Sequence, residues 1–190
     1  MNVIYLHGFR SSAASIKGQL LQQYCEKNPQ IQVHLPDLNM SPVETIQHMS
    51  ALIESLDHVS LVGSSLGGFY ATHLVAKHSV PAVLINPAMR PWQLFRELFD
   101  DELPLQVHPN WRLDNSHLDQ LEGLALPTAQ DADKILVLLQ QGDEVLDYRE
   151  AQRYYNGAAL VISETQGNHA MEDFADKIPM ALQFLSDCLK

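Results

Sequence analysis

Basic residues are scarce in this sequence. The 190-residue chain has 12 lysine and arginine residues against 23 aspartate and glutamate residues, which gives a formal net charge of −11. Nucleic acids and anionic membranes are bound through basic patches, so we expect neither of them to be a partner. The acidic residues do not form a block of like charge, and the sequence therefore predicts no disordered acidic tail.

Cysteine is equally rare. The two cysteines, Cys25 and Cys188, lie near opposite ends of the chain, and neither belongs to a Cys-x-x-Cys pair. This pattern favours reduced, unpaired thiols in a cytoplasmic protein. Residues 3–6 indicate a buried strand that is too short for a signal peptide or a membrane span, which also favours a cytoplasmic location. The sequence indicates no oligomeric state.

Metal-ligand spacing is missing as well. The nine histidines form no His-Glu-x-x-His motif, and the cysteines are not clustered with histidines. Metal sites in proteins usually show such groupings of ligands in the sequence. We therefore expect no metal ion.

What the sequence does contain is an alternation of strand-like and helix-like segments. Alternation of this kind is typical of α/β proteins, in which helices cover both faces of a parallel sheet. The length fits a single domain over residues 1–190. The predicted strands are 3–6, 31–35, 59–62, 80–85, 135–139 and 159–162, and the main predicted helices are 12–26, 41–56, 66–77 and 171–188.

One long segment, residues 87–128, interrupts this alternation. It contains no clear strand, but it has several prolines and aromatic residues such as Trp92 and Phe95. A long aromatic insertion between two core strands is often a lid or the wall of a binding site, and we expect a helical lid or cap here. A helix or two that packs on the edge of the core is the alternative. Trp92 and Phe95 are candidates for the wall of an apolar acyl pocket.

Two adjacent serines lie between glycines where the strand 59–62 meets the helix 66–77. The stretch Gly63–Gly67 fits the pattern Gly-x-Ser-x-Gly, in which the central Ser65 is the candidate nucleophile. A sharp turn there strains the backbone of the serine, and bulky side chains two residues away would collide. The glycines fit neither a phosphate-binding loop nor a dinucleotide-binding loop, because the required lysine and the second glycine are missing. A tight turn of small residues without chemistry is the remaining alternative.

Two later loops supply the partners that a nucleophilic serine needs. Asp143 follows the fifth predicted strand, where an acid can orient a histidine, and His169 follows the last strand, where its ring can reach Ser65. The order Ser, Asp, His along the chain is that of α/β-hydrolases and differs from the orders of two other common triads. Glu144 and Asp147 are alternative acids, and Asp147 is better interpreted as the cap of the following helix.

Backbone N–H groups near the serine complete the expected site. In the α/β-hydrolase fold, the oxyanion hole uses the N–H of the residue after the nucleophile, here Leu66. A second N–H comes from the loop after the first strand, and here we assign it to Phe9. His7 in the same loop is interpreted as a structural histidine that forms hydrogen bonds within the loop.

Taken together, these motifs resemble those of the YqiA-type esterases, which are small intracellular members of the α/β-hydrolase superfamily. The resemblance spans residues 3–184 and rests on YLHGF, GSSLGGFYAT, INPAMRP, QQGDEVLDY and GNHAM in this order. It implies that Ser65 is the nucleophile, Asp143 the acid and His169 the base of a catalytic triad. It also implies hydrolysis of small ester or acyl-thioester substrates without a cofactor.

The family pattern also bears on the sheet and on Arg90. Compared with the wider superfamily, this chain begins at what would be the third strand. This implies an α/β-hydrolase fold with a shortened, mostly parallel sheet of about six strands. Arg90 belongs to the INPAMRP motif, and we interpret it as a tie between the insertion and the core. The bidentate geometry of arginine leaves recognition of a substrate carboxylate as the alternative.

The sequence thus predicts a serine esterase that acts through an acyl-enzyme intermediate. The alternative from a different class is a binding or scaffold protein that kept the α/β-hydrolase fold and lost the chemistry. The presence of Ser65, Asp143 and His169 together argues against that alternative, because a protein that has lost catalysis usually lacks at least one member of the triad.

Overall fold

The centre of the protein is a six-stranded sheet, described in a computed structural model that covers residues 1–157 and 159–190. All five pairs of neighbouring strands are parallel, as the alternation of segments predicts. The fold class is therefore confirmed as α/β. In spatial order the strands are β2 (Gln32–His34), β1 (Asn2–Leu6), β3 (Val59–Ser64), β4 (Ala82–Ile85), β7 (Ile135–Gln140) and β8 (Leu160–Glu164).

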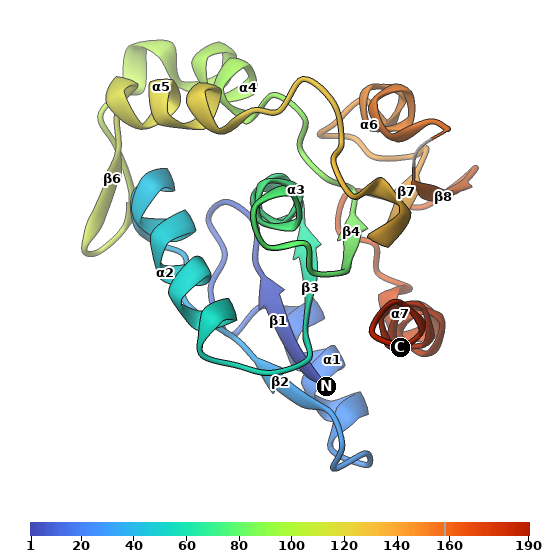
Figure 1. The fold of residues 1–190 in the computed structure, drawn as a ribbon. Helices are drawn as coiled ribbons and strands as arrows, with labels where there is room; N and C mark the ends of the chain where they lie inside the picture. Colours follow the sequence, from blue (N-terminus) through green and yellow to red (C-terminus); the bar gives the residue numbers. More distant parts are fainter. Residues whose placement is uncertain (158) are drawn as a thin grey trace.

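Helices cover both faces of this sheet (Figure 1). The strands of the centre are buried on both sides, which explains why they are continuous apolar runs and do not alternate with polar residues. In β4, Leu84 packs into the cluster on one face, whereas Val83 and Ile85 pack into the cluster on the other. One face is covered by α2 (Pro42–Glu54), α3 (Leu66–His78) and α6 (Tyr148–Tyr155), and the other by α1 (Ile16–Cys25) and α7 (Phe174–Cys188).

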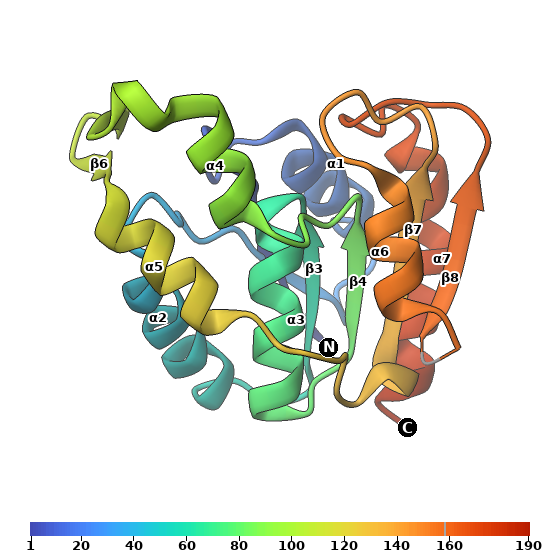
Figure 2. The ribbon, with the colours of Figure 1, turned by 90° about the horizontal axis from the view of Figure 1, so that it is seen from above.

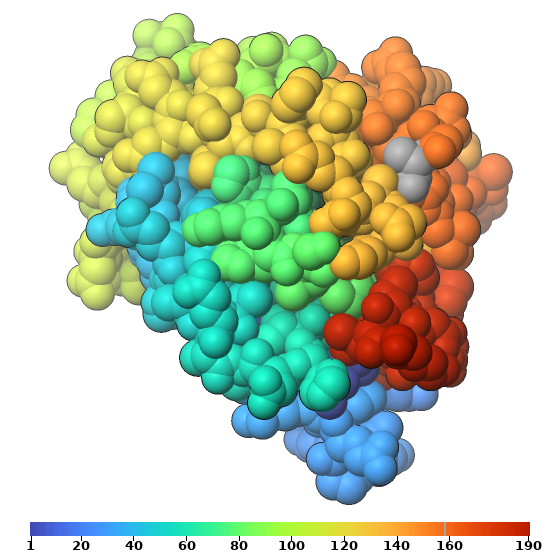
Figure 3. Space-filling view, in the orientation of Figure 1, coloured from blue at the N-terminus to red at the C-terminus, as the bar shows by residue number. Residues whose placement is uncertain are grey.

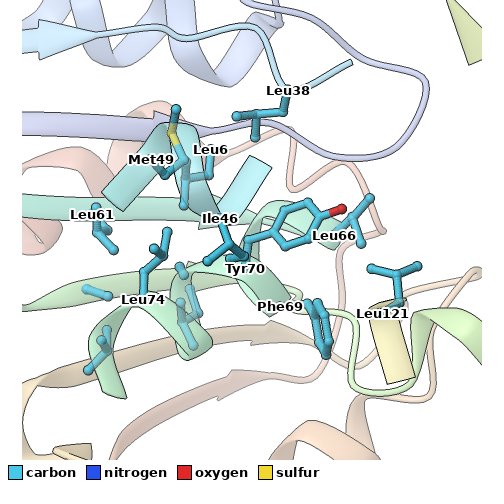
Figure 4. Packing of buried hydrophobic residues seen from close by; sticks show 14 of the residues in the cluster. Leu6, Leu38, Ile46, Met49, Leu61, Leu66, Phe69, Tyr70, Leu74 and Leu121 are labelled. Carbon is cyan, nitrogen blue, oxygen red and sulfur yellow. The ribbon is translucent and has the colours of Figure 1, made fainter. Parts of the chain in front are cut away.

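The packing of α2 and α3 on the sheet holds the start of α3 in place. Figure 4 shows Met49 of α2, Leu61 of β3 and Leu74 of α3 in one cluster, and all three side chains are fully buried. Burial of each such side chain stabilises the fold by roughly 1.5–3 kcal/mol. Because α3 is fixed along its length, the turn between β3 and α3 is also fixed.

The insertion lies above α2 and α3 and contains a hairpin that the sequence analysis missed (Figure 1). Its parts are α4 (Pro91–Phe99), a short 3₁₀ turn, β5 (Leu105–His108), β6 (Trp111–Leu113) and α5 (Asn115–Leu124). The expectation of no strand in this segment was wrong, since β5 and β6 form an antiparallel pair. Strands of three and four residues are too short to show a periodic pattern. Figure 3 shows the insertion, in yellow-green to yellow, as a layer along one side of the molecule.

The start of α2 agrees with its sequence signal, whereas the start of α7 does not. Ser41 accepts a hydrogen bond from the backbone of Glu44, and the side chain of Glu44 accepts one from the backbone of Ser41, which makes the predicted capping box. The last helix begins at Phe174 and not at residue 171, because Met171 has a left-handed backbone with φ of 46°.

Among the described residues, none of the helices combines the length and the apolar character needed to span a membrane.

Candidate active site

Ser65 lies at a sharp turn between β3 and α3. Its backbone angles are φ 54° and ψ −117°, which are strained for a residue with a side chain. The sequence analysis predicted that side chains two residues from Ser65 would collide, and the glycines at these positions agree with that prediction. A β-carbon on Gly63 would overlap the carbonyl group of Gly67, and one on Gly67 would overlap the carbonyl group of Leu6. Only glycine therefore allows the chain to pass this closely on both sides of Ser65.

Ser65, His169 and Asp143 form a continuous line of hydrogen bonds. The Nε2 atom of His169 lies 3.1 Å from Oγ of Ser65, and its Nδ1 atom lies 2.8 Å from Oδ2 of Asp143. Since the carboxylate can only accept, Nδ1–H donates to Asp143 and Nε2 is left to accept from the hydroxyl of Ser65. The Asp143 side chain is 2% exposed and that of His169 is 22% exposed, so the acid is screened from solvent while the ring stays accessible.

The acid is held by the loop that follows β7. The second oxygen of Asp143, Oδ1, accepts hydrogen bonds from the backbone N–H groups of Val145 and Leu146, both at 2.8 Å. The competing carboxylate of Asp147 instead accepts from the backbone N–H of Arg149 at 3.0 Å and caps α6. This is the role that the sequence indicated for Asp147.

Glu144 contacts His169 in a way that the sequence analysis did not foresee. Its Oε2 atom accepts a hydrogen bond from the backbone N–H of His169 at 3.0 Å. This hydrogen bond and one from the backbone N–H of Glu144 itself lower the pKa of the Glu144 carboxyl below its ordinary value. The loop that carries His169 is thus tied to the loop that carries Asp143 through the backbone as well as through the ring.

Two buried amide side chains attach the His169 loop to the sheet. The Nδ2 atom of Asn86 donates to the carbonyl groups of Asn168 and His169, at 3.1 and 3.2 Å. The Oε1 atom of Gln140 accepts from the N–H of Asn168 at 2.9 Å, and the backbone N–H of Gln140 donates to Oδ1 of Asn86 at 2.9 Å. Both amides are 3% exposed, so their hydrogen bonds have no competition from water.

Sequence reasoning missed Asn86 and Gln140 as parts of the site. A signal was present for each, because Asn86 follows an apolar strand directly within the INPAMRP motif and Gln140 is the polar end of another apolar run. A polar residue at the carboxyl end of a buried parallel strand lies at the edge where ligand sites gather. That rule could have pointed to both residues.

Lys17 approaches the same loop from α1. Its Nζ atom donates to the carbonyl group of Ala170 at 2.5 Å. Burial lowers the pKa of Lys17, and the negative charge of Asp143 acts in the opposite direction. The His169 loop therefore has contacts with β4, β7 and α1.

The proposed oxyanion-hole residues lie beside Ser65. A β-carbon on Gly8 would lie 3.3 Å from Cβ of Ser65, so the loop after β1 passes directly next to the serine. No residue that the structure describes accepts a hydrogen bond from the backbone N–H of Phe9 or of Leu66. His7 donates from Nδ1 to the carbonyl of Gly8 and accepts at Nε2 from the N–H of Leu38, both at 2.9 Å. These contacts agree with a structural role for His7.

The structure separates the two aromatic residues of the expected acyl pocket. The ring of Phe95 packs on that of Phe9, with centroids 4.4 Å apart, and thus supports the loop beside Ser65. Trp92 lies against Phe69, with centroids 6.1 Å apart, and lines a cavity of about 480 Å³. Phe95 is 5% exposed and Trp92 is 7% exposed, so both residues are largely buried.

Arg90 joins the start of the insertion to α6. The Nη2 atom of Arg90 donates to the carboxylate of Glu150 on α6, which agrees with the interpretation that Arg90 ties the insertion to the core.

Among residues 1–157 and 159–190, no group of three or more His, Cys, Asp or Glu side chains is placed so that it could hold a metal ion.

Comparison with known proteins identifies the family. Residues 2–186 match the model of UPF0227, which is described as an uncharacterised protein family. The chain belongs to this family. A UPF0227 protein from Serratia proteamaculans strain 568 is 23% identical over 190 residues, covering 91% of this chain and 92% of that protein. UPF0227 is the YqiA family, so the resemblance inferred from the motifs is confirmed.

Solved structures share the fold of this UPF0227 member at low identity. Alpha/beta hydrolase domain-containing protein 10 from mouse has a TM-score of 0.74 and 16% identity, and the match covers 100% of this chain and 90% of that one. Est1E from Butyrivibrio proteoclasticus, with ferulic acid bound, has a TM-score of 0.69 and 13% identity, with coverage of 99% and 88%. These similarities show that the UPF0227 chain has the α/β-hydrolase fold.

Proposed function

We propose that this UPF0227 member is a serine esterase that hydrolyses carboxylic esters, acyl thioesters included, of small molecules. The observation that carries the proposal is the line of hydrogen bonds from Ser65 through His169 to Asp143, set on a strained turn between strand and helix. Strained backbone at such a turn is typical of a nucleophile elbow, where the hydroxyl is raised above the sheet. The structural similarity to hydrolases such as the mouse protein supports the same class of reaction.

In the first step, Oγ of Ser65 attacks the carbonyl carbon of the substrate while Nε2 of His169 takes the hydroxyl proton. The carbonyl oxygen becomes an oxyanion and accepts hydrogen bonds from the N–H groups of Phe9 and Leu66. The carbon–oxygen or carbon–sulfur bond then breaks. The leaving alcohol or thiol takes the proton from Nε2, and the acyl group stays on Ser65.

In the second step, water replaces the leaving group. Nε2 of His169 takes a proton from the water as its oxygen attacks the acyl carbon, and the same proton returns to Oγ of Ser65 when the acid departs. Asp143 accepts from Nδ1–H throughout, which keeps the ring in the reactive tautomer and stabilises the imidazolium that forms.

A cavity of about 240 Å³ is the proposed place for the substrate. Ala88, Leu94 and Leu146 line it. The backbone N–H of Ala88 donates to the carbonyl of Ser65, and the N–H of Leu146 donates to Asp143, so two residues of the cavity wall are hydrogen-bonded to the two ends of the line of hydrogen bonds. Leu94 belongs to α4. On this proposal, residues 87–128 form a cap over the substrate, and Trp92 and Phe95 support the cap from within.

A cytoplasmic location and the lack of a cofactor stay predictions from the sequence.

Labelling with a fluorophosphonate probe tests the proposal and separates it from a non-catalytic binding protein. We expect the probe to label the wild-type chain and the Ser64→Ala variant but not the Ser65→Ala variant, because only Ser65 contacts His169. Hydrolysis of p-nitrophenyl esters and acyl-CoA thioesters should fall on the order of 10³-fold or more in Ser65→Ala. A chain that is folded and unlabelled would favour the binding protein, and labelling that persists in Ser65→Ala would refute the assignment of the nucleophile.

A further inference from the structure

A cavity of about 480 Å³ lies beside α3, and most of the residues that line it lie outside the proposed substrate cavity. Three side chains of α3 line it, namely Phe69, Thr72 and His73, while Ser65 and His169 do not. The other walls come from residues 88–90, from Trp92 of α4, from α6, and from the end of α5 with the linker that joins it to β7. Figure 2 shows how this linker runs from α5 past α3 toward β7. The volume falls within the range of small-molecule sites, which is roughly 300–1,000 Å³.

Most of the wall is apolar. Apolar and aromatic walls bind the alkyl or aromatic part of a ligand, because contact removes apolar surface from water on both sides. Three separate segments contribute these side chains, so the apolar wall comes from more than one side and does not form one flat patch. The apolar residues that define it are Phe69, Met89, Trp92, Leu124, Leu126 and Pro127.

Most neutral polar groups of the wall already have partners, and the exception among the described residues is the buried Nε1 of Trp92. The hydroxyl groups of Thr72 and Tyr155 are hydrogen-bonded to each other at 2.6 Å. Nδ1 of His73 donates to the carbonyl of Leu124 at 3.0 Å, and the hydroxyl of Tyr154 donates to the carbonyl of Leu126 at 3.1 Å. These groups therefore do not require a polar ligand body.

The charged groups leave one positive charge unmatched. Arg90 is paired with Glu150, so those two charges compensate each other. Arg153, one turn of α6 beyond Glu150, forms neither an ion pair nor a side-chain hydrogen bond with the residues that the structure describes, and it lines the cavity. In a chain with 23 acidic and 12 basic residues, a guanidinium without a carboxylate at the rim of an apolar cavity favours an anion.

We propose that this cavity binds a small amphiphilic carboxylate, with its apolar body against α3 and Trp92 and its carboxylate on the guanidinium of Arg153. Binding requires no reaction at Ser65, so this proposal stands or falls independently of the esterase activity. The site adjoins the 240 Å³ cavity, since Ala88, Met89, Arg90 and Glu150 line both, but its walls from α3 and from residues 124–127 do not belong to that cavity.

Contact quenching of tryptophan fluorescence by a brominated decanoate tests the proposal. The chain has two tryptophans, so the Trp111→Phe variant leaves Trp92, in the wall of the cavity, as its only tryptophan. In this background we expect saturable quenching by the brominated decanoate. Adding Arg153→Gln should raise the Kd about tenfold, because a charge-assisted hydrogen bond is lost. Arg153 is exposed, so this change leaves the core intact.

Two controls make the outcome decisive. Arg149→Gln removes a neighbouring arginine of α6 that lies on the ring of Tyr148 and does not line the cavity, so the Kd should stay as it was. Brominated decanol, which has no charge, should bind more weakly than the carboxylate and should be insensitive to Arg153→Gln. An absence of saturable quenching, or equal effects of the two arginine changes, would overturn the proposal.

Discussion

The backbone of Ser65 is strained by φ of 54°, a cost on the order of 1–3 kcal/mol that the surrounding fold must offset. Glycine adopts such angles without this cost. Strain of this kind persists where it serves a function, and on the proposed mechanism it places the hydroxyl of Ser65 beside His169. Stability and reactivity at residue 65 are therefore expected to move in opposite directions.

Ser65→Gly should raise the free energy of unfolding by about 1 kcal/mol, through relief of this strain, while it abolishes ester hydrolysis. Ser64→Gly is the matched control, because Ser64 belongs to β3. Glycine within a strand lowers stability by roughly 0.5–1 kcal/mol. Urea unfolding of the two variants measures both changes. A Ser65→Gly variant less stable than Ser64→Gly would contradict the strain at residue 65.

Asp143→Asn should lower kcat by several orders of magnitude, up to roughly 10⁴-fold, because an amide at this position favours the wrong tautomer of His169. Asp147→Asn should change kcat little, since its carboxylate caps α6 and lies outside the line of hydrogen bonds. Steady-state kinetics with a p-nitrophenyl ester compares the two. If Asp147→Asn proves the more damaging change, the acid has been assigned to the wrong residue.

At the scale of elements, the two amides at the ends of β4 and β7 connect the sheet to the loop of His169. Asn86 contributes two donors and one acceptor to this connection and adopts φ of 39°. Asparagine is among the residues that tolerate this region of backbone angles. The placement of the His169 ring thus depends on a side chain that does not touch it.

Asn86→Ala should lower kcat with little change in KM, because the loop of His169 loses its hydrogen bonds to β4 while no substrate contact is removed. It should also destabilise the fold by about 1–3 kcal/mol, since the buried N–H of Gln140 loses its acceptor. Gln141→Ala is the control at the neighbouring strand end, where the side chain donates to Ser163. Equal losses of kcat in both variants would show that Asn86 has no particular role in positioning His169.

At the scale of the molecule, an ion cluster fastens α7 to β8. Lys177 donates to Glu164 at 2.7 Å and to Asp173 at 2.8 Å. Hydrogen bonds from Lys177, and then from Gln140, lower the pKa values of Glu164 and Asp173 below their ordinary values of 4.5 and 3.8. A carboxyl with a lowered pKa stabilises the fold above its ordinary pKa, and this stabilisation is lost as the pH falls through the lowered value.

Stability should therefore fall as the pH decreases below about 4.5, and Lys177→Met should make this fall shallower. Lys190→Met is the control, because Lys190 pairs with Asp187 near the end of the chain and is largely exposed. Thermal unfolding between neutral and acidic pH measures the slopes. Parallel curves for Lys177→Met and the wild-type chain would show that this cluster does not contribute to acid sensitivity.

The sequence predicted those parts of the molecule that depend on local chemistry. The glycines around Ser65, the strand ends before Asp143 and the capping box of Ser41 each follow from short-range sterics or hydrogen bonding. The β5–β6 hairpin, and the links from Asn86 and Gln140 to the His169 loop, depend on contacts between segments far apart in the chain. No local pattern encodes the distance between such segments, so these features required the structure.

The connection between β4 and β7 has a consequence for changes in specificity. These strands are neighbours in the sheet, so the whole insertion between them is the crossover of one parallel pair. The cost of closing such a connection rises only slowly with its length, as (3/2)RT ln n. A crossover of different size could therefore be grafted between Arg90 and Ile135 without changing the register of the sheet. Such chimaeras would need apolar side chains in place of Phe95, Leu118 and Leu121, which are buried in the core. On the proposed function they would exchange the cap over Ser65, Asp143 and His169, which makes this segment the natural point for redesign.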